Sequence, residues 1–328
     1  QTCALPIFSL GLVFQNLNMC QTSSKTHIPK KSLLEPLLVF TREIGYIRRY
    51  WKCVARSIRR HRSCGFCLQH LYKYSRKKVT FIVNQIVLTG MVLSVAPVGE
   101  YDRRVVILTK EQGKISAFAK GSRRPNSPLV GAVNPFTFGE FTMYEGRSSY
   151  TIQSVNVSNY FSELRADVVG AYYGFYFLEV ANYYARERND ERELLRLLYQ
   201  TMRALTNPHL PNQLIRYIFE LKVLTINGQG PQVFQCVQCG DRTRPAVFSA
   251  AKGGLVCNEC DGEVRDGMFL DGSTLYTMQY IESSTIEKLY TFNVKPEVLE
   301  KFGRVMGRLM KMYVDKEFKS LEILETLL

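Results

Sequence analysis

The stretch Cys236-Val-Gln-Cys239-Gly240, followed by Val256-Cys257-Asn-Glu-Cys260, decides how the chain is organised. It contains two Cys-x-x-Cys pairs with seventeen residues between them. Each pair closes a tight turn, so both of its sulfurs reach one metal ion at about 2.3 Å, and two pairs complete a tetrahedral shell of thiolates. Gly240 supplies the backbone freedom that such a turn needs. The spacing therefore predicts one structural Zn²⁺, bound by Cys236, Cys239, Cys257 and Cys260.

Three other roles for these cysteines fit the rest of the chain less well. Disulfides are typical of small secreted domains that are dense in cysteine, and nothing in this sequence indicates export. A thioredoxin-like pair should open a helix after a strand, which is not the local pattern. Catalytic zinc keeps one position open for water, and zinc deaminases carry a His-x-Glu and a Pro-Cys-x-x-Cys that are missing here. Four cysteines close the metal shell, so function is expected elsewhere in the chain.

The positive charge of the chain is concentrated in its first quarter. The whole chain carries +14, but residues 1–79 hold 15 Lys and Arg against 2 acidic residues, whereas residues 80–328 hold 28 basic and 27 acidic residues. Five of the nine cysteines also precede residue 80, and this odd remainder favours a reducing compartment over a disulfide framework. No run of 18 apolar residues predicts a membrane span. We therefore expect a cytoplasmic protein without a membrane partner.

Residues 1–79 mix short apolar runs with basic clusters and show no sustained period of 2 or 3.6. Three interpretations remain open: a basic arm that contacts phosphates, an Arg-rich targeting peptide, or translation assigned too far upstream. The third is favoured because the composition changes abruptly near Val79, so this segment is expected to be non-native or disordered. A second metal site is not predicted at His61, Cys64, Cys67 and His70, because these residues are spaced too closely for a common zinc finger.

Residues 80–160 change to short β-rich runs separated by glycine and proline. Apolar and polar side chains alternate from Lys114 to Ala119, as in a strand with one buried face. Four other runs have a similar character, so strands are predicted over residues 85–96, 103–109, 114–119, 135–144 and 149–157. Five strands at this spacing suggest a sandwich or a small barrel, and the OB-fold barrel has this number.

A basic loop is predicted between the third and fourth strands, with the sequence Lys120-Gly-Ser-Arg123-Arg124-Pro-Asn-Ser-Pro128. Its glycine, asparagine and prolines are typical of loops. It carries three cations within five residues, and Arg103-Arg104 and Lys114 lie on neighbouring predicted strands. One face of the domain is therefore expected to be basic.

Cations beside exposed aromatic rings are typical of proteins that bind single strands, because cations neutralise phosphates while bases stack on the rings. The stacking candidates are Phe118, Tyr101 and Tyr144. The other aromatic side chains of this region are assigned to the core, namely Phe136, Phe138 and Phe141. The predicted phosphate-binding residues are Arg103, Arg104, Lys114, Lys120, Arg123 and Arg124; ordinary solvated charges are the alternative.

Helices are predicted on both sides of the cysteine module. One is expected from Ser162 to Arg188, and a second follows Asn189-Asp190, which can cap it. A third is opened by Pro211 and ended by Asn227-Gly228. After the module, helices are predicted over residues 271–280, 284–289 and 297–313, and the apolar stripe of the last is assigned to the core.

These predictions give an α+β multidomain fold. An N-terminal OB-fold barrel is followed by an all-α domain that carries a four-cysteine zinc module. The expected boundaries are residues 1–79 for the basic segment, 80–160 for a DNA-binding barrel, 161–235 and 263–328 for the helical domain, and 236–262 for the zinc module.

Several short motifs resemble one known family. They are Gly90-Met-Val-Leu93, Gly99-Glu-Tyr-Asp-Arg-Arg-Val-Val-Ile-Leu-Thr109, Gly113-Lys114, Ala119-Lys-Gly-Ser-Arg-Arg124 and Asn134-Pro135-Phe136. In order and spacing they resemble the opening of RecO, the family of bacterial recombination mediators. The order of helices, cysteine module and further helices is also similar. The resemblance covers residues 85–328 and leaves the first 79 uncovered, and RecO proteins start close to the first barrel strand.

The resemblance implies a non-enzymatic protein of recombinational repair, located in the bacterial cytoplasm at the nucleoid. RecO-like proteins bind single- and double-stranded DNA, anneal complementary strands, contact the acidic tail of single-stranded-DNA-binding protein, and act with RecR to load RecA. The residues agree with the expected non-enzymatic role, because no Walker loop, Gly-x-Gly-x-x-Gly motif or nucleophile elbow is visible. Two rival hypotheses are an RNA-binding or ribosome-associated protein with an OB barrel and a zinc ribbon, and a protein-interaction adaptor.

Overall fold

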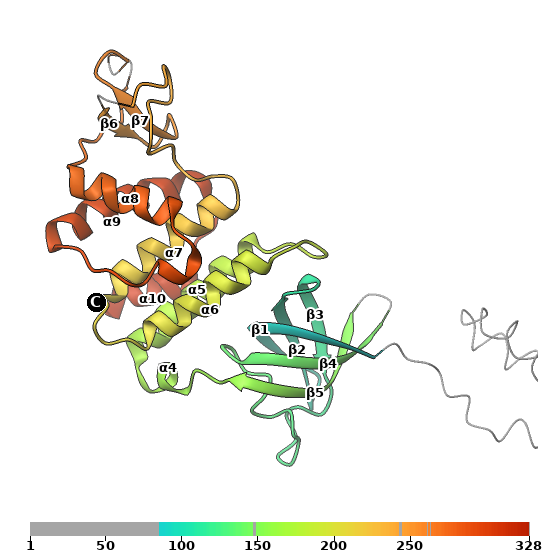
Figure 1. The fold of residues 1–328 in the computed structure, drawn as a ribbon. Coiled ribbons are helices and arrows are strands. Elements are labelled where there is room, and N and C mark those ends of the chain that lie inside the picture. Colours follow the sequence, from blue (N-terminus) through green and yellow to red (C-terminus); the bar gives the residue numbers. More distant parts are fainter. Residues whose placement is uncertain (1–84, 147–148, 243–244, 261, 263, 328) are drawn as a thin grey trace, which may run out of the picture. The chain divides into compact units, whose positions relative to one another are not determined.

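The protein is described by a computed structural model that covers residues 85–146, 149–242, 245–260, 262 and 264–327. The chain divides into two units, residues 1–80 and 81–328, and the description concerns the second. The expectations for residues 1–79 therefore lie outside the described residues. The second unit contains a five-stranded barrel, a helical domain and a two-stranded hairpin (Figure 1). The predicted fold class, an OB-like barrel followed by helices with a cysteine module, is confirmed.

The five barrel strands close in the order β1-β2-β3-β5-β4. Neighbouring strands are antiparallel except for a short parallel pair between β3 and β5, which completes the closure. The strands are β1 (Gln85–Val98), β2 (Asp102–Thr109), β3 (Gly113–Ala119), β4 (Phe138–Glu145) and β5 (Tyr150–Asn159).

All five predicted strands are present, and the largest difference is at β4. This strand begins at Phe138 rather than near Pro135, because Phe136 has a left-handed backbone with φ of 73° and turns the chain. Along β3 the buried and half-buried residues alternate as predicted. The barrel interior is filled by side chains that include Val92, Val105, Ile107, Phe141 and Met143, each fully buried.

The helical domain is built from segments on both sides of the hairpin. Before it come α4 (Ser162–Ala166), α5 (Val168–Tyr184), α6 (Arg192–Leu205) and α7 (Asn212–Ile226). After it come α8 (Gly272–Ser283), the 3-10 turn η3 (Ile286–Lys288), α9 (Pro296–Tyr313) and α10 (Lys319–Leu327). Among the described residues, no helix combines the length and the apolarity needed to cross a membrane.

Several details of the helices differ from the prediction, including α5, which ends at Tyr184 rather than at Arg188, and residues 284–289, of which only Ile286–Lys288 form a 3-10 turn. The helix predicted over residues 162–188 is divided at Asp167, whose carboxylate accepts the Val169 amide and caps α5. The N-cap of α6 is Glu191 rather than Asn189-Asp190. The last helix, α10, has no counterpart among the predicted helices. It packs along α5, where the Ser320 hydroxyl donates to the Glu179 carboxylate at 2.8 Å.

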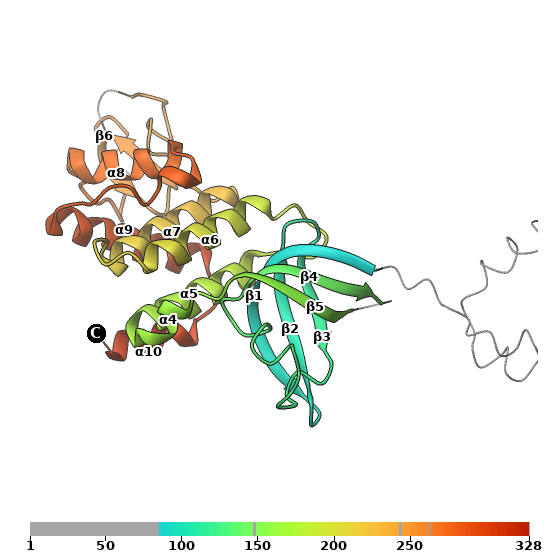
Figure 2. The same cartoon turned by 60° about the horizontal axis from the view of Figure 1, so that its bottom comes forward.

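The barrel lies against α5 and α6 (Figure 2), and a few of its residues join the apolar core of the helical domain. Met91, Leu108 and Phe136 of the barrel region are buried together with side chains of α5, α6 and α7. Phe136 and α5 approach closely at Gly174, where a β-carbon would lie 2.8 Å from the phenyl ring. Glycine is therefore needed at this point of α5.

The turn between β2 and β3 is attached to the connection between α5 and α6. The Lys114 amide donates to the Arg186 carbonyl at 2.9 Å, and the Arg188 amide donates to the Gln112 carbonyl at 3.0 Å. Gly113 lies between these bonds with φ of 64°, and a β-carbon there would lie 2.5 Å from the Arg186 oxygen. The contact thus depends on a residue without a side chain.

Candidate nucleic-acid interface and metal centre

The β1–β2 turn and the loop after β3 lie together at one end of the barrel. The Arg123 amide donates to the Tyr101 carbonyl at 2.9 Å, and the Arg123 guanidinium donates to the Gly99 carbonyl at 3.2 Å. The Gly121 amide donates to the Asp102 carboxylate at 2.7 Å. These three bonds hold the basic loop against the turn, so its cations have defined neighbours.

One exposed arginine of this loop stacks on an exposed aromatic ring. The Arg124 guanidinium stacks over the Tyr101 ring, 5.0 Å from its centroid, and Tyr101 is 42% exposed. Such a cation–π contact orders both groups. Lys120 and Arg123 are also exposed nearby in the sequence. The structure thus combines cations and an accessible ring, as a surface for phosphates and bases requires.

The neighbouring arginines of β2 have different surroundings. Arg103 is half-buried and donates to the Asn134 side-chain oxygen at 3.1 Å and to the Val130 carbonyl at 3.3 Å, so it braces the β3–β4 connection. Arg104 is exposed and donates to the Ser116 hydroxyl on β3 at 2.8 Å. Its partner in the strand register is the half-buried Phe118.

Lys114 lies elsewhere, at the other end of β3. Its ammonium donates to the Asn182 carbonyl of α5 at 2.7 Å, and burial lowers its pKa. Tyr144 is also distant from the loop, because it pairs with Gln85 at the start of β1 whereas the turn follows the end of that strand. We call the remaining group the basic end: Tyr101, Arg103, Arg104, Lys120, Arg123 and Arg124. Two acidic residues, Glu100 and Asp102, accompany it in the turn.

The four predicted metal ligands are brought together by the hairpin. The sulfurs of Cys236, Cys239, Cys257 and Cys260 all lie within 4.8 Å of one another, and those of Cys239 and Cys257 are 3.5 Å apart. Sulfurs at about 2.3 Å from one tetrahedral ion are separated by about 3.8 Å. The donor set therefore fits one metal ion with four thiolate ligands.

Backbone hydrogen bonds preform both cysteine turns. The Gly240 amide donates to the Cys236 carbonyl at 3.0 Å, and the Cys260 amide donates to the Cys257 carbonyl at 3.0 Å. Gly240 has φ of 77°, which explains the glycine after the first pair. Burial raises the pKa of the Cys236 thiol, but amides such as those of Cys257 and Gln238 donate to its sulfur and lower the pKa to about 6. A thiolate is the form that binds metal.

The hairpin formed by β6 (Pro245–Ser249) and β7 (Gly254–Cys257) rests on the helical domain. Phe248 and Leu255 are buried in the helical core. The Gln279 side chain of α8 donates to the Val233 carbonyl at 2.7 Å, just before the first cysteine turn. The cysteines themselves belong to a separate small cluster around Val256. The metal centre therefore lies on the outer side of the hairpin, away from the helical core.

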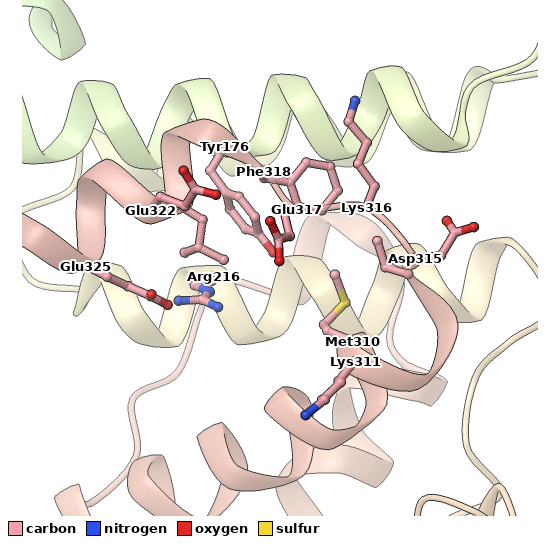
Figure 3. Close-up of a pocket in the computed structure, with 12 residues that line it drawn as sticks. Tyr176, Arg216, Met310, Lys311, Asp315, Lys316, Glu317, Phe318, Glu322 and Glu325 are labelled. Atoms are coloured by element: carbon pink, nitrogen blue, oxygen red, sulfur yellow. The ribbon is translucent and has the colours of Figure 1, made fainter.

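A cavity of about 540 Å³ lies between α5, α7 and the C-terminal residues 310–325 (Figure 3). Its floor includes Tyr176 and Arg216, both bonded to the buried carboxylate of Glu220 at 2.6 and 2.7 Å. The rim is of mixed charge, since cations such as Lys311 and Lys316 alternate with carboxylates. Sequence reasoning missed this cavity because α10, which forms one of its walls, was not predicted. Its charges give no preference for an anionic ligand.

Known protein families match both halves of this architecture. The family described as recombination protein O, N terminal, matches residues 83–161, and recombination protein O, C terminal, matches residues 165–322. The chain belongs to the RecO family. The two matches cover the barrel and the helical domain with its cysteine hairpin, so the family resemblance stated from short motifs is confirmed.

Individual RecO relatives match over almost their whole length. A DNA repair protein RecO of Acetivibrio thermocellus is 30% identical over 247 residues, which cover 75% of this chain and 98% of the relative. A DNA repair protein RecO of Alkaliphilus metalliredigens is 32% identical over 236 residues, covering 71% of this chain and 96% of the relative. The relatives therefore support a role in DNA repair for this RecO-family chain.

Proposed function

We propose that this RecO-family protein is a recombination mediator that binds single- and double-stranded DNA and anneals complementary strands. With RecR it helps to load RecA onto strands coated by single-stranded-DNA-binding protein, whose acidic tail it contacts. The observation that supports the DNA-binding part is the basic end, where Arg124 stacks on the exposed ring of Tyr101 and Arg123 donates to the Gly99 carbonyl of the same turn. This activity places the protein in the bacterial cytoplasm, at the nucleoid.

Annealing at this surface needs charge neutralisation and accessible bases, and no covalent bond is made or broken. Lys120, Arg123 and Arg124 neutralise phosphates, which releases counterions and makes binding depend on salt. Tyr101 offers a ring on which a base can stack while its pairing edge stays open. Arg103 positions the connection that follows the loop through its bonds to Asn134 and Val130. The protein is accordingly proposed to be non-enzymatic.

The metal is proposed to be a single structural Zn²⁺. Four thiolates form a closed shell without a position for water or substrate, which is the arrangement of structural zinc sites. The ion holds the hairpin folded on the helical domain, and Cys236, Cys239, Cys257 and Cys260 are its proposed ligands. Zinc content of the purified protein, measured by mass spectrometry, should be about one ion per chain.

Charge reversal of Arg123 and Arg124 tests the basic end. The double variant R123E/R124E should weaken binding of an oligothymidylate by at least about tenfold and reduce the slope of log affinity against log salt by about 1.5, because two phosphate contacts are lost. The matched control K110E/K319E has the same net charge and changes two exposed lysines outside the basic end. Equal binding by the two variants at several salt concentrations would refute the assignment.

Strand annealing on residues 80–328 tests the wider proposal. Complementary oligonucleotides should anneal faster with the protein than without it, also when they are coated by single-stranded-DNA-binding protein. A competition experiment separates this proposal from the RNA-binding hypothesis. If the protein binds RNA, RNA of the same sequence should displace the bound DNA. Preferential binding of RNA, together with a failure to anneal DNA, would remove the mediator proposal.

A further inference from the structure

We propose that the exposed face of α9, with the adjoining turn of the cysteine hairpin, is a second binding surface for a nucleic-acid strand. We call it the α9 surface and define it by Lys252, Arg304, Gly307, Arg308 and Lys311. The proposal rests on the proposed function only for the identity of the polyanion as DNA.

The residues of α9 that define this surface form one stripe. Relative to Arg304 they lie three, four and seven positions along the helix, so their side chains share one face. All four are exposed. The opposite face is buried, as Phe302, Val305, Met306 and Leu309 have no exposed area. The cations therefore point to solvent because the apolar stripe of the same helix is fixed in the core.

The hairpin turn extends the stripe with another cation. The Arg308 guanidinium donates to the Asp266 carbonyl at 2.7 Å, while the Asp266 carboxylate accepts the Ala251 amide at 2.9 Å. The turn that carries the exposed Lys252 thus lies beside the C-terminal half of α9. Gly253 is also close, since its β-carbon position would lie 3.7 Å from the Tyr313 hydroxyl.

Two acidic groups lie near Arg304 and Arg308, and both are already engaged. The Asp266 carboxylate accepts hydrogen bonds from Ala251 and from the Ser249 hydroxyl within the hairpin. Glu300 pairs with Arg304 at 3.1 Å, an exposed contact that a phosphate can replace at little cost. Arg308 and Lys311 have no carboxylate partner among the described residues. Lys311 also lines the cavity beside α10, whose rim carries several carboxylates, so the positive charge of the α9 surface is concentrated at Lys252, Arg304 and Arg308.

Gly307 is a second, independent indication that a ligand binds to this face of α9. A glycine inside a helix is about 1 kcal/mol less favourable than alanine. Gly303, one turn earlier, is required by packing, because a β-carbon there would lie 2.6 Å from the Tyr217 hydroxyl oxygen. At Gly307 a β-carbon would meet nothing within 4 Å. The fold does not need this glycine, but it leaves the helix backbone open to a ligand between Arg304 and Lys311.

A polynucleotide fits this surface better than an acidic peptide does. Arg304 and Lys311 are separated by about 10 Å along the helix axis, which is the length of about three phosphates in one strand of a duplex. A regular row of cations thus matches a regular row of phosphates. The hairpin and α9 also lie apart from the barrel in both views (Figures 1 and 2). One molecule can then hold two strands, as annealing requires.

The test measures capture of a second strand by the full chain. Protein is bound to an immobilised oligothymidylate, and retention of a second, fluorescent oligothymidylate is then measured. R308E/K311E should bind the first strand within about threefold of the unchanged protein but lose second-strand capture by at least about tenfold. K110E/K319E serves as the control of equal charge and should capture the second strand normally.

The variant G307Q separates binding from folding. Glutamine is a better helix former than glycine, so this variant should unfold at a temperature no lower than that of the unchanged protein, yet capture the second strand several times less well. Normal capture by R308E/K311E would overturn the α9 surface even if R123E/R124E loses the first strand as the proposed function requires. If R308E/K311E instead loses binding of polyglutamate and keeps DNA capture, the surface binds acidic protein and the proposal is wrong.

Discussion

The barrel and the cysteine hairpin obtain their stability in different ways. The barrel has a closed sheet around its own interior, with Val105, Ile107 and Phe141 fully buried. The hairpin has two strands of five and four residues, and its own cluster consists of Cys236, Val256 and Cys257 with a few half-buried neighbours. Two-stranded hairpins are at best marginally stable alone. The comparison indicates that apolar burial is enough for the barrel, whereas the hairpin depends on packing against the helical domain, and we expect it to depend also on a metal held by its four cysteines.

Loss of the metal should produce the largest effect and should be confined to one region. Cys257→Ser removes a buried ligand, and the hairpin should lose several kcal/mol of stabilisation because metal binding and local folding are coupled. Hydrogen exchange should show lost protection of amides in residues 236–257 and unchanged protection in β1–β5. Binding of DNA to the basic end should stay within about twofold of normal.

The neighbouring substitution Asn258→Ser is the matched control, since Asn258 is exposed and lies between two ligands without being one. It should leave both metal content and hydrogen exchange unchanged. If Cys257→Ser exposes the barrel amides as well, the two regions are one cooperative unit and the comparison fails.

A pair of glycines tests how firmly the barrel is attached to the helices. Gly113→Ala should cost about 2–4 kcal/mol, because it combines a left-handed backbone with a contact of 2.5 Å to the Arg186 carbonyl. Gly99→Ala has a similar φ of 57° but meets nothing within 4 Å, so it should cost only about 1–2 kcal/mol. Urea unfolding measures both. Equal losses would mean that the β2–β3 turn is not a structural attachment.

Substitution of Asp271, at the start of the helix that follows the hairpin, should have a small effect on stability. Its carboxylate caps α8 by accepting the Ser273 and Thr274 amides at 3.1 and 3.0 Å, and Lys301 donates to it at 2.8 Å. Asp271→Ala should therefore lower the free energy of unfolding by about 1 kcal/mol at pH 7. The exposed Glu300→Ala loses one surface ion pair and should cost less than about 0.5 kcal/mol.

The effect of Asp271 should also depend on pH in a defined direction. The Lys301 ammonium and then the Thr274 amide lower the pKa of its carboxyl below the ordinary value. Its contribution is therefore complete above the unfolded-state pKa of about 3.9 and is lost as the pH falls through the lower folded-state pKa. The difference between Asp271→Ala and the unchanged protein should be constant from about pH 5 to 7 and should narrow below pH 4. A gap that widens in acid would contradict this assignment.

The local sequence pattern predicted a helix or strand well where interactions between residues close in the sequence decide its structure. The apolar stripe of α9 is an example, since Phe302, Val305 and Leu309 are buried as predicted. The break at Asp167 was missed because a helix cap competes there with an otherwise continuous helical pattern. The short helix α10 was missed because its stability comes from packing against α5 rather than from its own nine residues.

The sequence by itself determined the cysteine centre and the alternation of the barrel strands, because ligand spacing and a period of two are properties of the local chain. Only the tertiary structure decided which outward-facing cations are available to a ligand. Lys114 and Arg104 both point out of the barrel, yet α5 covers Lys114 and leaves Arg104 exposed. A period of two says that a side chain leaves the sheet, but what covers it depends on residues far away in the chain.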